Sequence, residues 1–142
     1  MRTLTLTGLA ALALFSSPAA FAEVLHYSAT LDGASETPPN TSKASGTADV
    51  TLDTESKMLS WTVTYADLSG PASAAHFHGP AAVGVAAGVT VPIPPPLKSP
   101  ISGSASINDG QIGDLRAGLW YVNVHTAQNP KGEIRGQVLA SK

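Results

Sequence analysis

Two short segments of alternating apolar and polar residues, joined by a tight turn, constrain the fold more than any other feature of this sequence. Apolar side chains fall at every second position in residues 46–53, and the same is true of residues 57–65. Because successive side chains of a strand point to opposite faces, this pattern predicts two half-buried strands. Residues 54–56 are short enough to connect them as an antiparallel hairpin.

The remaining chain repeats this pattern between turn signals. Residues 24–31 predict another half-buried strand, with His26 as a solvated residue on its polar face. A single helical turn is expected at 111–117, ended by Gly118. Further strands are expected around His76 and His78 and over residues 89–93, 101–107, 119–126 and 133–140. Seven to eight antiparallel strands without a long helix predict an all-β domain, either a Greek-key-like β-sandwich or a flattened barrel.

Two longer loops separate some of these strands. Residues 32–45 contain Pro38 and Pro39, which cannot donate ladder hydrogen bonds and therefore end the first strand. Residues 79–88 are mostly small. They form either a flexible loop over a site or a plain connection, and the sequence leaves both interpretations open.

The first 22 residues are expected to be a signal peptide. Arg2 precedes an apolar run over residues 4–15, and Ala20 and Ala22 fit the small-x-small cleavage rule. The run is too short to cross about 30 Å of hydrocarbon, so cleavage after Ala22 is favoured over a membrane anchor. The prediction is a secreted or periplasmic protein in which residues 23–142 form a single domain with no membrane segment.

The composition excludes several kinds of chemistry. The chain has no cysteine, so disulfides, thiol nucleophiles, thiolate ligands and iron–sulfur clusters are ruled out. It has eight basic residues, one of them Arg2 in the leader, against ten acidic ones. There is no basic patch, so a nucleic-acid partner is not expected. The expected partner is a protein or a small ligand outside the cytoplasm.

Histidine is concentrated in two of the predicted strands. His76 and His78 flank Phe77, so alternation places both imidazoles on one face, with Cα atoms about 6.6 Å apart. His125 falls on the face of its strand opposite Val124. If the two strands are neighbours, three nitrogens converge on one metal ion. Imidazole suits copper and zinc, and copper is favoured in an exported chain without cysteine. The alternative is that the histidines bond to main chain and fix loops.

Four other polar residues are candidates for supporting these histidines. Asn123 shares the outward face of its strand with His125. Glu133 and Arg135 alternate on the last strand, and the favoured interpretation is an exposed cross-strand ion pair. The alternative is that they orient His125. Glu36 is interpreted as a turn residue that could also reach the site.

No motif indicates an enzyme. The chain contains no Gly-x-Ser-x-Gly elbow, and no acid is placed to orient a histidine as a general base. A binding module is therefore favoured over an enzyme, and no catalytic residue is assigned.

Five sequence blocks resemble the CHRD domain, a module named after chordin that also occurs in many bacterial exported proteins. The blocks are 31–33 (Leu-Asp-Gly), 36–39 (Glu-Thr-Pro-Pro), 75–81 (Ala-His-Phe-His-Gly-Pro-Ala), 120–126 (Trp-Tyr-Val-Asn-Val-His-Thr) and 129–137 (Asn-Pro-Lys-Gly-Glu-Ile-Arg-Gly-Gln). They occur in the family's order, and the resemblance runs from about residue 24 to residue 139. It implies an extracytoplasmic β-rich module, which in animal relatives belongs to an antagonist of secreted growth factors.

A looser resemblance is to Cu/Zn superoxide dismutase. That family also carries a His-x-His pair on a strand of a Greek-key sandwich and a further copper histidine late in the chain, which His76, His78 and His125 match. A bridging histidine, the zinc ligands and a disulfide are missing. The resemblance therefore implies at most a mononuclear copper site. Three hypotheses follow: a metal-binding module, a purely structural or interaction module, and a copper-only redox enzyme.

Overall fold

The computed structural model describes residues 21–141, in which eight antiparallel strands form one sheet in the order β5-β4-β7-β8-β1-β2-β3-β6. The predicted signal peptide falls largely on residues 1–20, outside the described part. The strands are β1 (Val24–Asp32), β2 (Ser45–Asp53), β3 (Met58–Ala66), β4 (Ala72–His78), β5 (Val89–Pro92), β6 (Ile101–Ser106), β7 (Trp120–Thr126) and β8 (Ile134–Ala140), and the helix is α1 (Asp109–Arg116).

The predicted hairpin is β2–β3. The two strands pair along their whole length, from Ser45 opposite Ala66 to Asp53 opposite Met58. Their inward side chains are fully buried at most positions, whereas the threonines between them are mostly exposed. The alternating pattern therefore identified both the strands and the face that packs into the core.

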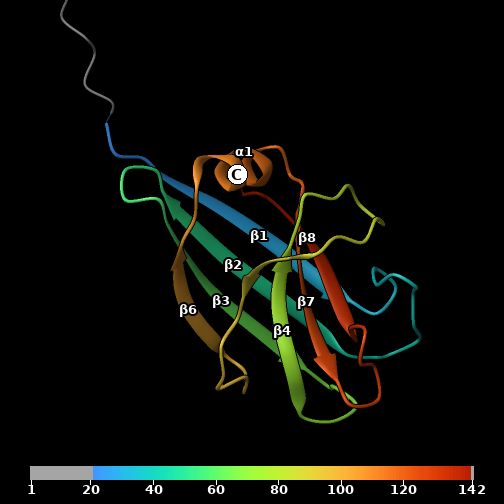
Figure 1. The fold of residues 1–142 in the computed structure, drawn as a ribbon. Coiled ribbons are helices and arrows are strands. Elements are labelled where there is room, and N and C mark those ends of the chain that lie inside the picture. The colour runs from blue at the N-terminus through green and yellow to red at the C-terminus, as the bar shows by residue number, and fades with distance from the viewer. Residues whose placement is uncertain (1–20, 142) are drawn as a thin grey trace, which may run out of the picture.

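The sheet curls until its two ends face each other. Phe77 of β4 meets Trp61 of β3 edge to face, with ring centroids 5.4 Å apart, although the two strands are far apart in the sheet order. Figure 1 shows β4 and β7 in front of the layer formed by β1, β2 and β3. The all-β prediction is confirmed, and the form is a nearly closed, barrel-like sheet around one apolar core.

The barrel stays open between β5 and β6, its two edge strands. These strands follow each other in the chain, separated by residues 93–100. Prolines occupy positions 94–96 and 100 of this connection. Because proline has no N–H to donate, the connection cannot extend a hydrogen-bonded ladder from one edge to the other.

The helix is longer than expected and begins earlier. Asn108 caps α1 by accepting from the Gln111 N–H at 2.9 Å, while the Gln111 side chain accepts from the Asn108 N–H. Residues 108–110, which follow β6, form the start of this capping box and the first turn. The helix buries Leu115, and Gly118, at φ +71°, follows its end.

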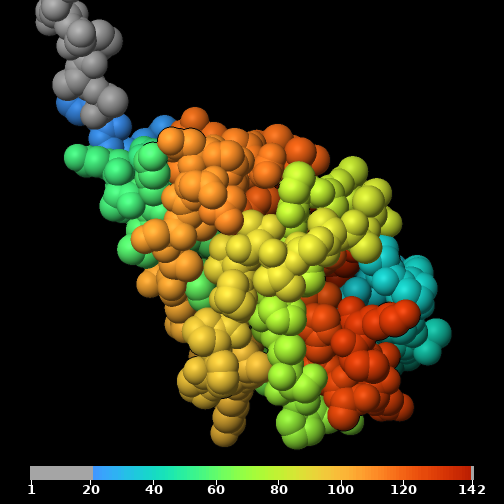
Figure 2. Space-filling view, viewed as in Figure 1, coloured from blue at the N-terminus to red at the C-terminus, as the bar shows by residue number. Residues whose placement is uncertain are grey.

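The outer face of β4, β7 and β8 is covered, which the sequence did not predict. Asn123 was expected to look outward, yet it is only 3% exposed, as is Tyr121 on the same strand. Two loops lie over this face: residues 33–44 between β1 and β2, and residues 79–88 between β4 and β5. In Figure 2 their cyan and yellow-green atoms lie beside the orange-red atoms of the β7–β8 region. The covered face forms a second, polar interior next to the apolar core.

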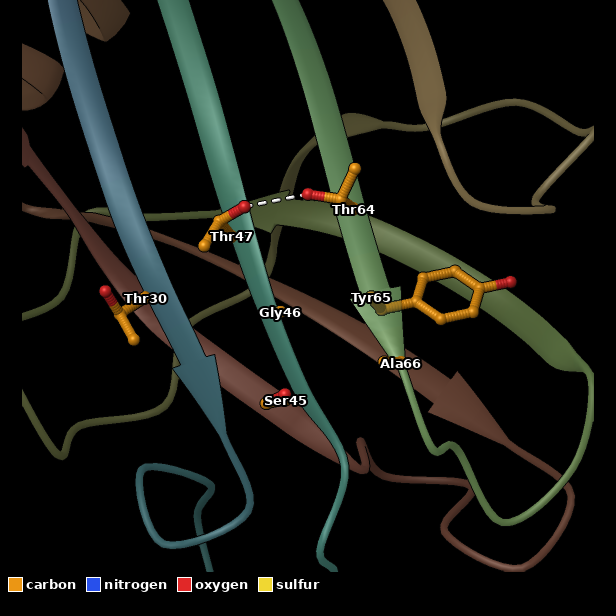
Figure 3. Close-up of a pocket in the computed structure, with 7 residues that line it drawn as sticks. All are labelled: Thr30, Ser45, Gly46, Thr47, Thr64, Tyr65 and Ala66. Atoms are coloured by element: carbon orange, nitrogen blue, oxygen red, sulfur yellow. Dashed lines mark hydrogen bonds between the residues drawn. The ribbon is translucent and has the colours of Figure 1, made fainter.

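The outer face of β1, β2 and β3 is open by contrast. A hollow of about 380 Å³ lies there, lined by residues 30, 45–47 and 64–66, and Thr47 and Thr64 share a 2.7 Å hydrogen bond across it (Figure 3). Its one titratable side chain is Tyr65, whose hydroxyl already donates to the Leu97 carbonyl. This surface has no group arranged for chemistry, so the candidate site lies elsewhere.

Candidate metal centre

The three histidines of the two predicted strands come together under the loops. β4 and β7 are neighbours, with His76 opposite Asn123 in the register. One nitrogen from each of His76, His78 and His125 lies within 4.8 Å of the others, and His76 Nδ1 lies 3.2 Å from His125 Nε2. His26 lies exposed on β1, as predicted. The structure therefore supplies the strand adjacency on which a three-histidine site depends.

Main-chain carbonyls fix the protonation of two of these rings. His78 Nδ1 lies 2.9 Å from the Ala87 carbonyl oxygen, and His125 Nδ1 lies 3.0 Å from that of Pro130. A carbonyl only accepts, so each Nδ1 carries the proton and donates. In the neutral imidazole the other nitrogen, Nε2, then presents a lone pair. Both lone pairs are directed at the centre of the cluster.

The surroundings favour the neutral form of His76 and His125. Burial lowers the pKa of His76, and the neighbouring His125 and His78 lower it further. Burial also lowers the pKa of His125, partly opposed by the hydrogen bond to Pro130 and reinforced by His78. Neutral imidazole is the form that binds metal ions. His78 is buried whereas His76 and His125 are half-buried, so the cluster is reached from their side.

Asn123 lies at the base of the cluster. Its Oδ1 is 3.0 Å from His78 Nε2 and 3.0 Å from His125 Nε2, and its Nδ2 donates to Glu36 Oε1 at 3.4 Å. Glu36 is 4% exposed and belongs to the loop over the site, and its carboxyl group reaches the Asn123 amide. Burial raises the pKa of Glu36, against the hydrogen bonds from Thr37 and Asn123 and the charge of Arg135.

Gly132 closes the space behind these two side chains. It adopts φ +129°, and a Cβ placed on it would overlap the Glu36 carboxyl group and the Asn123 amide. Both the backbone conformation and the close approach require glycine here. In the sequence, Gly132 belongs to the block 129–137, and nothing in its residue type connects it with the histidines.

Arg135 joins the two covering loops. It donates to the Thr37 hydroxyl at 3.0 Å and to the Val85 carbonyl at 2.8 Å. Its guanidinium carbon lies 3.5 Å from the centroid of the Tyr121 ring, and the His78 ring stacks on the same tyrosine at 4.7 Å with 3° between the planes. Two groups this close must occupy opposite faces, so Tyr121 is held between a cation and a cluster histidine.

The expected ion pair between Glu133 and Arg135 is wrong. Both residues are buried, at 0% and 1% exposure, and the salt bridge found within residues 21–141 joins Lys57 to Asp109 instead. The Glu133 carboxylate accepts from Ser42, Ser69 and Thr126. Burial alone would raise its pKa, but these hydrogen bonds outweigh burial and lower it to about 2. The hydrogen bonds of the Glu133 and Arg135 side chains go to other residues, and the ring of His125 is oriented by the Pro130 carbonyl.

Several residues that build the site escaped the sequence analysis. The carbonyls of Ala87 and Pro130 orient two rings, but main-chain groups leave no residue-type signal. Tyr121 lies on the same face as Asn123 and His125, and this shared face was the signal that could have identified it.

The fold and the cluster define an all-β domain that holds three histidines close together beneath two loops. The chain belongs to the CHRD domain family, whose model matches residues 27–138. This range extends from β1 to β8 and includes all three histidines, so the resemblance to this family is confirmed. No curated protein and no solved structure matches the chain, so nothing adds to the likeness to Cu/Zn superoxide dismutase. Within the described residues, no helix is long and apolar enough to cross a membrane.

Proposed function

We propose that this CHRD domain is an exported binding module that holds one metal ion, copper in preference to zinc, on His76, His78 and His125. One observation carries the proposal: His78 Nε2 and His125 Nε2 each present a lone pair to the cluster, and neither nitrogen carries a proton because the proton of each ring is on Nδ1. Both nitrogens lie 3.0 Å from the same Asn123 oxygen, so their lone pairs and that oxygen repel one another, and a cation among them removes the repulsion.

The spacing of the nitrogens fits a transition-metal ion. Metal–nitrogen bonds of about 2.0–2.1 Å place two ligands of a tetrahedral ion about 3.3 Å apart. His76 Nδ1 and His125 Nε2 already lie 3.2 Å apart. The ligand nitrogens of all three residues lie within 4.8 Å of one another, so a bound ion draws the rings slightly together. A ligand set of three imidazoles and no thiolate favours copper or zinc over the harder cations.

Export is the second part of the proposal. It rests on the charged start, the short apolar run and the Ala-Phe-Ala cleavage site of the first 22 residues. The first strand, β1, begins at Val24, one residue beyond the proposed mature N-terminus at Glu23, so removing the leader takes nothing from the sheet. The domain would act in the periplasm or outside the cell, where copper and zinc are accessible to it.

A second candidate is a structural or interaction module, and the buried Glu133 favours it. Glu133 binds Ser42, Ser69 and Thr126 and contacts none of the histidines. It lies in one of the blocks that carry the family resemblance. At least part of those blocks therefore serves to hold loops in place, whatever the histidines bind.

Titration of the chelator-stripped mature domain with Cu(II), Cu(I) and Zn(II) tests the proposal. Wild-type protein is expected to bind one equivalent and to melt at a higher temperature when loaded. His125→Ala should lose both effects, whereas His26→Ala, which removes the exposed histidine of β1, should keep them. Equal uptake by wild type and by single Ala variants of the three cluster histidines would refute the site.

A further inference from the structure

The three histidines leave one position of a four-coordinate ion to be filled, and Asn123 lies next to it. Its side-chain oxygen is 3.0 Å from both His78 Nε2 and His125 Nε2, the two atoms whose lone pairs are fixed by main-chain carbonyls. An amide oxygen has no proton to donate to them. At hydrogen-bond distance, three acceptors therefore meet with no hydrogen atom among them.

The structure also shows why this oxygen faces the histidines. The amide nitrogen of Asn123 donates to Glu36 Oε1 on the opposite side, and Glu36 is held in the covered interior by the loop of residues 33–44. Gly132 leaves the room in which the carboxyl group and the amide pack against each other. A carboxylate accepts and does not donate, so it selects the orientation that turns the amide nitrogen toward itself and the oxygen toward the rings.

We propose that Asn123 Oδ1 is the fourth ligand of the metal ion, so that the site is a three-nitrogen, one-oxygen centre closed on its buried side, with Glu36 as the residue that positions the oxygen. This inference rests on the proposed metal site. It assigns a ligand role to a residue that spacing suggested only as a support. It also predicts the kind of site: the protein fills four positions, as in structural and storage centres, and any further ligand enters from the half-exposed side of His76 and His125.

Two variants test the assignment. Asn123→Ala removes the oxygen, and the double variant Asn123→Asp with Glu36→Gln restores an oxygen at the same place with an amide behind it. We expect Asn123→Ala to weaken Cu(II) and Zn(II) binding at least about tenfold in chelator competition. The EPR spectrum of its Cu(II) form should differ from wild type. The double variant should regain most of the affinity and show an oxygen-donor spectrum.

The outcomes separate this inference from the metal site itself. If wild-type protein binds no stoichiometric metal, both fail. If wild type binds one ion through the histidines and Asn123→Ala matches it in affinity and EPR spectrum, the fourth-ligand assignment is overturned and the three-histidine site stands. Tighter binding by Asn123→Ala would also overturn it, because the amide would then be a donor that competes with metal for the ring nitrogens. If Asn123→Ala does not fold, the double variant decides the question: weak metal binding by the folded double variant, or a Cu(II) EPR spectrum without an oxygen donor, overturns the assignment.

Discussion

Substituting Glu133 by Gln should remove a large acid-sensitive part of the stability of this domain. The carboxylate is fully buried and accepts from two serines and a threonine, which together hold its pKa at about 2, compared with an ordinary value of 4.5. At about 1.36 kcal/mol per pK unit, this difference corresponds to about 3 kcal/mol of stability in favour of the ionised, folded form. One residue thus carries a contribution comparable to a large part of the net stability of a small domain.

The sign of the effect follows from the lowered pKa. Above pH 4.5 the carboxyl group is ionised in both the folded and the unfolded chain, and its stabilisation is fully present. Between pH 4.5 and about 2 the unfolded chain takes up the proton first, so the stabilisation is progressively lost. Glu36, whose pKa is raised by burial, acts in the opposite direction above pH 4.5, where rising pH weakens its contribution.

Urea unfolding of the mature domain between pH 2 and 7 measures this contribution directly. The difference in free energy of unfolding between wild type and Glu133→Gln should be constant above pH 5 and shrink by about 3 kcal/mol toward pH 2. Taking the difference cancels the titration of the other carboxylates, which both proteins share. Two curves that run parallel over the whole range would show that the hydrogen bonds to Glu133 do not favour its charged form.

Three other perturbations have defined outcomes. Gly132→Ala should reduce stability by about 1–3 kcal/mol and weaken metal binding, because alanine is strained at φ +129° and its Cβ would displace the Glu36 carboxyl group and the Asn123 amide. The control is Gly113→Ala in α1, where there is open space, and it should be neutral or stabilising in the same melts. Arg135→Lys should cost about 1–3 kcal/mol and increase protease cleavage in the loops 33–44 and 79–88, because Arg135 serves each loop with a different guanidinium nitrogen and lysine has a single nitrogen without that planar fork. Cleavage unchanged from wild type would refute this. Since burial lowers the pKa of His125, Zn(II) affinity should persist below pH 6.5 and fall only at more acid pH. A fall in Zn(II) affinity that is centred at or above pH 6.5 would contradict the lowered pKa of His125.

The apolar core of this fold could be predicted from the sequence, because each strand of the β2–β3 hairpin has one buried face and one solvent-exposed face. In this hairpin the buried and exposed residues alternate as the apolar and polar residues do, so the sequence pattern predicts the strands, their register and the core residues. The same rule also placed His76 and His78 on one side of β4 and His125 on one side of β7. It could not show that the strands are neighbours, since β4 and β7 pair across 41 intervening residues.

The polar interior could not be predicted from the sequence, because loops rather than strands bury it. Asn123, Glu133 and Arg135 look like ordinary outward residues of an antiparallel sheet, and the pattern of an exposed face predicts a weak surface ion pair. Residues 33–44 and 79–88 cover that face instead, and each buried polar group then requires a specific partner. Glu133 finds hydroxyls and Arg135 finds a hydroxyl, a carbonyl and an aromatic ring, none of which can be inferred from the spacing of charges.

This division makes the covering loops part of the candidate metal site. The Ala87 carbonyl that sets the protonation of His78 lies in the loop 79–88, and the Pro130 carbonyl that sets His125 lies between β7 and β8. Arg135 holds the loop 79–88 through the Val85 carbonyl, and Glu133 holds the loop 33–44 through the Ser42 hydroxyl and also binds the Ser69 N–H. None of these hydrogen bonds involves a ligand nitrogen. If the loop 79–88 or the β7–β8 connection loosens, His78 or His125 loses the carbonyl acceptor that fixes its tautomer. The lone pairs are then no longer presented together. The two candidate functions are therefore linked physically: the buried charges that serve the structure are also what makes three scattered histidines a set of ligands.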